Sequence, residues 1–334
     1  MPAGGPRRRN HARGHTRTRA RVRRLALGAA TSALGAAVVH EASRRSWAAA
    51  PDPCGPDGMA LPAGEEHRVA TDDGAVLSAT VTGPADGPPI VLAHCFMCTR
   101  DVWGGVARQL VAGGHRVVLY DHRGHGTSTI GSDTFTIARL GADVGAVLGH
   151  FELTDVVLAG HSIGGMAAQA FAVAHPDAAA ARLRGLVLVA TSARPSPMPT
   201  TSVTVERVLG ERRLRMPTGT IGHASVRGAF GRAAPPAYHL EYVRSRVEGT
   251  SAGARVGGAV AISHMDLRSH LDRVAVPTTV VAGSLDLLLP PYHARAMARR
   301  IPGARLEVLR GAGHMLPMER PDEVAAAITA HTPA

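Results

Sequence analysis

The chain has 334 residues, of which 45% are hydrophobic and 3% aromatic, and its formal net charge at pH 7 is +11. A chain of this length can bury a large core, either as one large α/β domain or as two small domains. Residues 1–45 hold eleven arginines and one acid, Glu41, a charge of +10, so residues 46–334 carry only +1. The body of the chain therefore lacks the charge of a basic nucleic-acid binder, and we expect no nucleic-acid partner.

The N-terminal region combines an arginine block with fifteen uncharged residues at 25–39. This order resembles the n- and h-regions of an export signal. The apolar part is rich in Ala and Gly, however, and is shorter than the about 20 residues that span a bilayer. We predict that residues 1–50 are a signal, an anchor or a disordered tail. Membrane association through residues 1–45, or export, is favoured over a cytoplasmic location.

The three cysteines are Cys54, Cys95 and Cys98, too few and of odd number for a disulfide framework. Cys95 and Cys98 form a C-x-x-C, but the chain has no second such pair, and the nearby histidines do not fall at a zinc-binding spacing. A dithiol redox centre likewise lacks its usual sequence context. We expect no metal and no cofactor, and we expect these thiols to pack as small apolar side chains.

From about residue 65 onward, short apolar runs alternate with longer Ala-rich stretches. An alternating run at 76–81 fits a half-exposed strand, and the later runs fit strands that are covered on both faces. The later runs are 90–94, 116–120, 155–160, 185–190, 278–283 and 305–310. Helical stretches separate them, at 100–112, 137–149, 164–175, 292–300 and 321–330. This alternation predicts a doubly wound, mostly parallel sheet with helices on both faces.

The alternation breaks once, at residues 193–270, which begin with several prolines and contain no buried strand run. A segment of this length is too long for a loop inside a compact domain, and we interpret it as an inserted helical lid. The predicted organisation is a tail at 1–50, the first part of the core at 65–192, the lid at 193–270 and the second part of the core at 271–334.

A serine follows the third of the buried runs, 155–160. In open parallel sheets, ligands gather at the carboxyl ends of the strands, where Gly160-His161-Ser162-Ile163-Gly164 lies between a strand and a helix. The pattern G-x-S-x-G presents a serine on a strained turn, which requires small neighbours, and the following helix N-terminus favours a developing negative charge. The alternative interpretation of Ser162 is an ordinary helix N-cap.

An acid and a histidine follow later strands. Asp286 comes after the run 278–283, and His314 comes after the run 305–310. A serine hydroxyl becomes a good nucleophile when a base takes its proton and a third group orients that base. Asp286 could instead be a helix cap and His314 a loop histidine. The order Ser, Asp, His, with each residue directly after a strand, nevertheless favours a catalytic constellation.

Four motifs together resemble one known family. DHRGHGTS at 121–128, GHSIGG at 160–165, GSLDLLLP at 283–290 and GAGH with ERP behind it at 311–321 are similar to motifs of the α/β-hydrolase-fold serine hydrolases. The resemblance covers residue 65 to the end and extends to actinobacterial esterases and lipases with Arg-rich N-termini. It implies an eight-stranded sheet, Ser162 as nucleophile, His314 as base and Asp286 as the acid that orients the base.

The resemblance also implies an oxyanion hole. His94-Cys95-Phe96 occupies the loop where the family usually has H-G-F, so the expected donors are the backbone N–H groups of Phe96 and Ile163. Cys95 departs from the usual glycine. If this position required a positive φ, the cysteine would be strained and the oxyanion hole would be shifted.

A serine nucleophile disfavours the epoxide hydrolases and haloalkane dehalogenases of this fold, which use an aspartate. We predict hydrolysis of a carboxylic ester with a small or lipophilic acyl group, so that the partner is a small-molecule ester. Thioesterases, C–C hydrolases, amidases and cofactor-free perhydrolases ("haloperoxidases") share the same triad and remain alternatives. A non-enzymatic alternative is an inactive hydrolase-fold protein that binds a ligand.

Overall fold

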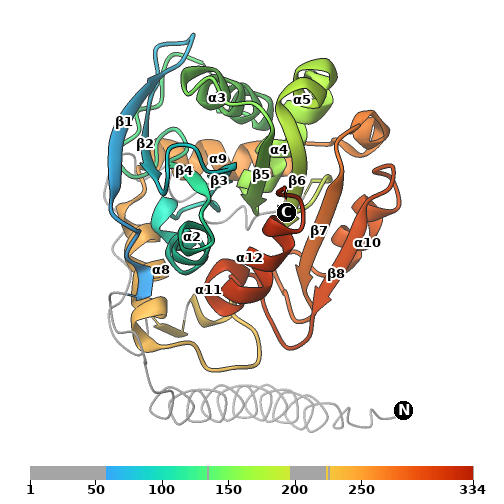
Figure 1. Cartoon of the computed structure of the whole chain (residues 1–334). Helices are drawn as coiled ribbons and strands as arrows, with labels where there is room; N and C mark the ends of the chain where they lie inside the picture. The colour runs from blue at the N-terminus through green and yellow to red at the C-terminus, as the bar shows by residue number, and fades with distance from the viewer. Residues whose placement is uncertain (1–57, 134, 196–222, 225, 334) are drawn as a thin grey trace, which may run out of the picture. The chain divides into compact units, whose positions relative to one another are not determined.

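The computed structural model describes residues 58–133, 135–195, 223–224 and 226–333 of the chain. Within these residues, one eight-stranded sheet has the order β1-β2-β4-β3-β5-β6-β7-β8. Its strands are β1 Gly64–Ala70, β2 Val76–Thr82, β3 Pro89–Ala93, β4 Arg116–Tyr120, β5 Val156–His161, β6 Leu183–Val189, β7 Thr278–Gly283 and β8 Arg305–Leu309. β2 pairs antiparallel with β1 and β4, and every later pair is parallel. Figure 1 shows β1 in blue at one edge and β8 in red at the other. The prediction of a mostly parallel eight-stranded sheet is confirmed.

Burial explains which strands the sequence reveals. Every residue of β5 and of β7 is buried, as expected for parallel strands that helices cover on both faces. β1 was not predicted, because its sequence GEEHRVA has no apolar run and most of its residues are exposed. Its strand conformation comes from pairing with β2 at the edge of the sheet.

Helices cover both faces of the sheet (Figure 1). α2 contacts α12 beside β6 and β7, and α3 contacts α4, which also packs on β3, β5 and β6. Each predicted helical stretch is confirmed to within a few residues, and the short α5 and α11 are additional. The α-helices are α2 Gly104–Ala112, α3 Ile137–His150, α4 Ile163–Ala174, α5 Pro176–Arg182, α8 Ala237–Gly249, α9 Ala252–His264, α10 Tyr292–Ala298, α11 Leu316–Glu319 and α12 Pro321–Thr329. Two 3-10 helices, η2 Arg100–Trp103 and η3 Arg268–Arg273, accompany them.

A buried ion network fixes the loop after β4. The guanidinium of Arg123 is fully buried and donates two hydrogen bonds of 2.7 Å to the Asp143 carboxylate on α3. Arg123 Nη1 also donates to Asp73 Oδ2 at 2.7 Å and to the carbonyl oxygen of Ile130. A buried charge needs such complete pairing, because burial removes it from the solvation that bulk water provides. The network joins α3 and the β1–β2 turn to the DHRGHGTS loop.

The described part of the segment 193–270 forms α8, α9 and η3, and no strand occurs in it. A Cβ added at Gly257 of α9 would lie 2.7 Å from Cβ of Phe135, so α9 packs closely on the core through small residues. On α8, the Tyr242 hydroxyl lies 3.1 Å from Thr99 Oγ1, and Arg246 contacts Asp101 at 2.9 Å. The described part of this segment is thus helical, and its action as a lid stays a prediction.

The predicted tail at residues 1–50 lies outside the described residues, as does 196–222 of the predicted lid. Within the described part of the chain, no helix has both the length and the apolar character needed to cross a membrane.

Candidate active site

Ser162 occupies a strained turn between β5 and α4. Its φ is 55° and its ψ is −115°, a conformation that non-glycine residues rarely adopt. A Cβ at Gly160 would overlap the carbonyl oxygen of Gly164, so only glycine allows the two ends of the turn to approach this closely. Hydrogen bonds from Ser162 N to Val189 O at 2.9 Å and from Thr191 Oγ1 to Ser162 O at 2.6 Å hold the backbone. The sequence-based interpretation of the G-x-S-x-G turn is consistent with this geometry, and Ser162 has no side-chain cap hydrogen bond.

Asp286 follows β7 and His314 follows β8, and their side chains lie within hydrogen-bonding distance of each other. Asp286 Oδ1 accepts the backbone N–H groups of Leu288 at 2.9 Å and Leu289 at 2.8 Å, which leaves Oδ2 directed at the imidazole. His314 Nδ1 lies 2.8 Å from Asp286 Oδ2. Because the carboxylate oxygen is an acceptor, Nδ1 carries the hydrogen and Nε2 keeps the lone pair that a general base uses. Both side chains are buried.

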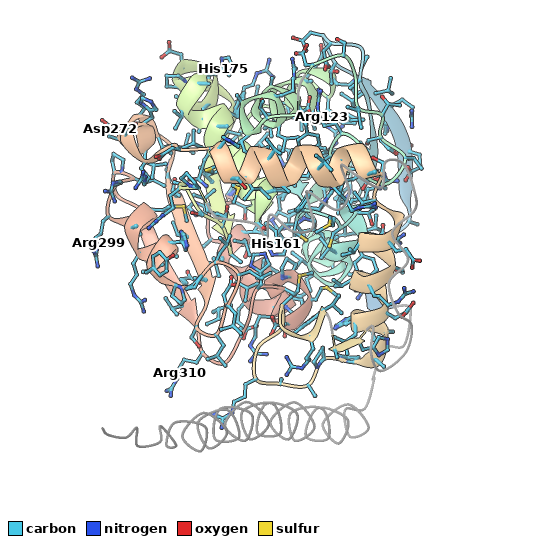
Figure 2. All side chains as sticks on the ribbon, turned by 180° about the vertical axis from the view of Figure 1, so that it is seen from behind. Arg123, His161, His175, Asp272, Arg299 and Arg310 are labelled. Atoms are coloured by element: carbon cyan, nitrogen blue, oxygen red, sulfur yellow. The ribbon has the colours of Figure 1, made fainter. Side chains whose placement is uncertain are left out.

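The histidine loop also contacts the serine turn. His161 Nε2 donates to the carbonyl oxygen of His314 at 2.8 Å, and the two rings lie 5.1 Å apart between centroids. His161 immediately precedes Ser162, so this bond ties the residue before the serine to the loop of the histidine. No hydrogen bond joins Ser162 Oγ to the His314 ring among the hydrogen bonds of the described residues. In Figure 2, α9 crosses the view, with Arg123 labelled above it and His161 labelled below it.

The loop at residues 94–98 is fixed by two histidines. His94 Nδ1 donates to the carbonyl oxygen of Cys95 at 2.7 Å, and its Nε2 accepts from His122 N at 2.9 Å. Met97 N donates to His125 Nε2 at 3.2 Å. The positive φ of the loop, 55°, falls on Met97, and Cys95 does not have a positive φ. The strain that a cysteine in place of glycine would cause is therefore absent at Cys95.

The same loop lies against the start of α4. A Cβ at Gly164 would overlap the carbonyl oxygen of Ala93 and would lie 2.7 Å from that of His94. The backbone of the predicted oxyanion loop thus directly contacts the first turn of the helix that follows Ser162. The Phe96 ring, two residues after His94, meets α9, where a Cβ at Gly258 would overlap it.

The two thiols of the C-x-x-C are buried and free. Burial raises the pKa of Cys95 well above its usual value, with the hydrogen bond to Cys98 acting in the same direction. A raised thiol pKa disfavours the thiolate, which is the reactive and metal-binding form. This environment agrees with thiols that pack as small apolar groups.

Buried histidines surround the predicted oxyanion loop and are neutral at physiological pH. Burial lowers the pKa of His122 to about 3 and that of His125 to about 4, and nearby His125 further lowers that of His122. Burial also lowers the pKa of His94 well below its usual value. The Asp121 carboxyl at the end of β4 has a pKa raised to about 6 by burial, although Arg100 opposes this. The neutral rings can both donate and accept, which the loop requires.

Sequence reasoning assigned no role to His161 or Glu319. His161 is a variable position of G-x-S-x-G, and Glu319 belongs to the ERP motif behind His314. The Glu319 carboxylate accepts hydrogen bonds from the backbone N–H of Gly231 at 2.7 Å and of Gly313 at 3.1 Å. The motif was a signal that Glu319 matters, but only the fold reveals these partners.

The chain is similar in sequence and structure to several known proteins. The family described as alpha/beta hydrolase fold matches residues 88–321. A non-heme chloroperoxidase from Burkholderia pyrrocinia is 30% identical over 238 residues, which are 66% of this chain and 83% of that protein. A rhodomycin D methylesterase from Streptomyces peucetius is 28% identical over 300 residues, 79% of this chain and 97% of that protein. The crystal structure of an enol-lactonase from Burkholderia xenovorans is similar with a TM-score of 0.68 and 26% identity, covering 79% of this chain and 99% of the other.

Proposed function

Because the chain belongs to the alpha/beta hydrolase fold family, we propose that it is a serine hydrolase that cleaves a carboxylic ester through Ser162, His314 and Asp286. The observation that carries the proposal is the hydrogen bond of 2.8 Å between His314 Nδ1 and Asp286 Oδ2, in a loop that His161 ties to the strained turn of Ser162. A buried carboxylate that selects the imidazole tautomer and sets its orientation is what a general base needs.

The proposed reaction has two halves. His314 Nε2 takes the proton of Ser162 Oγ as the oxygen attacks the acyl carbon, and the same proton then passes to the departing alcohol. Water, activated by His314, releases the acid from the acyl-enzyme. The bond between Ser162 Oγ and His314 that this requires is often long before a substrate binds.

Phe96 N–H and Ile163 N–H are the proposed oxyanion donors. Neither donates a hydrogen bond to another group among the described residues, and the close contact of Gly164 with Ala93 holds their two segments together. Losing one such donor typically costs about 2.7–4 kcal/mol of transition-state stabilisation. The macrodipole of α4, which begins at Ile163, adds to the stabilisation of a negative charge there.

An ester is the favoured substrate class because two of the relatives are named for ester chemistry. One is a methylesterase and the other is an enol-lactonase, whose substrate is a cyclic ester. Each of these names describes the relative. For this chain they support an oxygen ester over a thioester or a carbon–carbon bond, and the acyl group is proposed to be small or lipophilic.

A series of p-nitrophenyl esters, from acetate to laurate, tests activity and acyl preference together. Wild type should hydrolyse part of the series, and Ser162→Ala should lose at least about 10³-fold in kcat/KM. A fluorophosphonate probe should label wild type at Ser162. A folded wild type that hydrolyses no ester and forms no adduct would contradict the proposal and would favour an inactive binding protein.

Perhydrolysis is the second candidate, because the chloroperoxidase of Burkholderia pyrrocinia is 30% identical to this chain. In that reaction hydrogen peroxide replaces water, attacks the acyl-enzyme and leaves as a peracid, while Ser162 regains its proton. Adding peroxide and bromide to the ester assay separates the two, because a peracid oxidises bromide to hypobromous acid, which then brominates a phenolic indicator dye. Bromination that exceeds the Ser162→Ala background would favour perhydrolysis.

A further inference from the structure

Two backbone segments meet beside His314. One is the strap, which we define as residues 226–232 of the inserted segment, and the other is the histidine loop, residues 310–315. A Cβ at Gly231 of the strap would overlap the carbonyl oxygen of Gly311, and a Cβ at Gly313 would lie 2.5 Å from the carbonyl carbon of Phe230. Only glycine permits such an approach, so the two segments are packed backbone against backbone.

The strap binds the backbone of His314 itself. The N–H of His314 donates to the carbonyl oxygen of Ala229 at 2.8 Å, and Met315 N–H donates to the same oxygen at 3.2 Å. In the opposite direction, Arg232 N–H donates to the carbonyl oxygen of Gly311 at 2.7 Å. The N–H of His314 is therefore held by the inserted segment, while its carbonyl oxygen is held by His161.

This close packing leaves two N–H groups without a backbone partner, those of Gly231 and Gly313. A buried N–H without an acceptor costs free energy, so a side chain must supply one. Glu319, at the end of α11, reaches both: its Oε2 accepts from Gly231 N at 2.7 Å, and both of its oxygens lie 3.1 Å from Gly313 N. One carboxylate therefore bridges the strap and the residue directly before His314.

We propose that Glu319 is a positioning residue that sets the orientation of His314 by joining the strap to the histidine loop. The inference rests on the proposed function, in which His314 is the base. The inserted segment then contributes to the reaction through the geometry of the base as well as through any contact with substrate.

Catalysis should be sensitive to the position of the histidine loop, because the loop sets where His314 Nε2 lies relative to Ser162 Oγ. The Asp286 carboxylate fixes the imidazole from one side, so a shift of the loop turns the ring about this contact and moves Nε2. A displacement of about 1 Å can cost about 10²-fold in rate. In this role Glu319 acts through the backbone of the strap and the histidine loop rather than on the substrate, so KM should change much less than kcat.

Glu319→Ala removes both acceptors, and Glu319→Gln keeps one acceptor but places an NH2 group where the second carboxylate oxygen was. We expect kcat for the best p-nitrophenyl ester to fall by about 10–100-fold in the alanine variant and by less in the glutamine variant. KM should stay within about threefold of wild type. The exposed Glu323 lies in the first turn of α12 and pairs with Arg320 at 3.6 Å rather than with the backbone of the histidine loop. It provides the matched controls Glu323→Ala and Glu323→Gln, which should keep wild-type kcat.

A variant on the strap side tests the same idea without touching the carboxylate. Gly231→Ala pushes a methyl group against the histidine loop, whereas Gly228→Ala, three residues earlier, has no atom within 4 Å of its new Cβ. We expect Gly231→Ala to lower kcat in the manner of Glu319→Ala, and Gly228→Ala to leave it unchanged. If Glu319→Ala does not fold, Gly231→Ala and Glu319→Gln still decide the question.

All rates are normalised to active sites titrated with the fluorophosphonate probe, so a loss of folded protein does not count as a loss of kcat. A normalised kcat equal to wild type in folded Glu319→Ala or Gly231→Ala overturns the inference, as does a rise in KM with kcat unchanged. Failure of the proposed function is distinct, because wild type itself would then lack activity and labelling.

Discussion

Arg123 carries its charge in the interior, where it contacts two carboxylates from separate parts of the chain. The resemblance of DHRGHGTS to a family motif marked the residue, but the sequence did not reveal that Asp73 and Asp143 would be its partners. Those contacts span about 50 and 20 residues and exist only once β4, α3 and the β1–β2 turn have packed together.

Replacing Arg123 with methionine should reduce the free energy of unfolding by about 3–5 kcal/mol, because two buried carboxylates lose their counter-charge. Urea unfolding followed by circular dichroism measures the change. The control is Arg184→Met, which breaks a surface ion pair between Arg184 and Asp155. Their side chains are 40% and 54% exposed, respectively, so this change should reduce the free energy of unfolding by less than about 1 kcal/mol. Equal losses in the two variants would contradict this account of Arg123.

His125 makes stability depend on pH with a definite sign. Its pKa is about 4 in the folded protein because of burial, below the about 6.5 of an unfolded histidine. Between these pH values His125 is protonated in the unfolded chain and neutral in the folded protein. The stabilisation is therefore complete above about pH 6.5 and is lost as pH falls toward 4. Asp121, with its pKa raised to about 6, acts in the opposite direction, so wild type alone cannot isolate His125.

The difference between wild type and His125→Gln isolates this histidine. As the pH falls from 6.5 to 4, wild type loses stability through His125 and the variant does not. The unfolding free energy of the variant should therefore rise relative to that of wild type by up to about 1.4 kcal/mol for each pH unit. Urea titrations at several pH values give the difference. The exposed His175→Gln is the control and should follow wild type. A constant difference across this range would refute the assignment.

At the scale of elements, α9 lies on the core through glycines, and one of them meets Phe96. Gly258→Ala would overlap the Phe96 ring, which would have to move together with the loop that carries the proposed oxyanion donor. We expect kcat/KM to fall by about tenfold or more, since the loss of a donor typically costs about 2.7–4 kcal/mol.

Gly253→Ala is the matched control on the same helix. Its new Cβ would be 3.4 Å from Ile130, an ordinary contact, and alanine is a better helix former than glycine by up to about 1 kcal/mol. Activity in this variant should equal wild type. If Gly258→Ala also keeps wild-type activity, then α9 does not hold the proposed oxyanion loop in place.

The elements that sequence predicts well are those whose burial leaves a pattern. The residues of β4 and β7 coincide with the apolar runs 116–120 and 278–283, because both strands are buried throughout most of their length. β1 is exposed and polar, so its conformation depends on pairing with β2 and leaves no such pattern.

In the candidate site, too, some features could be predicted from the sequence and others could not. Ser162, Asp286 and His314 could be proposed from motifs and from their places after strands, and the structure joins the last two directly. The contacts of Glu319 with Gly231 and of His314 with Ala229 could not be predicted, because backbone groups carry no sequence signature. The position of positive φ, on Met97 rather than Cys95, also follows from the folded loop alone.

For the whole molecule, charge is concentrated in a short part of the chain. Residues 1–45 carry +10 and residues 46–334 carry +1, so binding to an anionic surface should depend on the tail. We expect the full chain to sediment with phosphatidylserine vesicles at low salt and to be released at high salt, because each arginine near such a surface contributes about 1 kcal/mol and is screened by ions.

A chain lacking residues 1–50 should remain in the supernatant and keep the unfolding midpoint of the full chain, since the family match begins only at residue 88. Phosphatidylcholine vesicles, which carry no net charge, are the control for the full chain. Equal sedimentation of the two chains with anionic vesicles would show that the tail is not the determinant.

The strap sets a limit on exchanging parts between related enzymes. β6 and β7 are neighbours in the sheet, so the sequence between them can be replaced by one of different length without altering the order of the strands. A chimaera designed to broaden the range of accepted esters should nevertheless keep this chain's own residues from Val226 onward. Foreign sequence there would have to supply a carbonyl oxygen for the N–H of His314, and a graft that fits the sheet perfectly could still leave the proposed base misaligned.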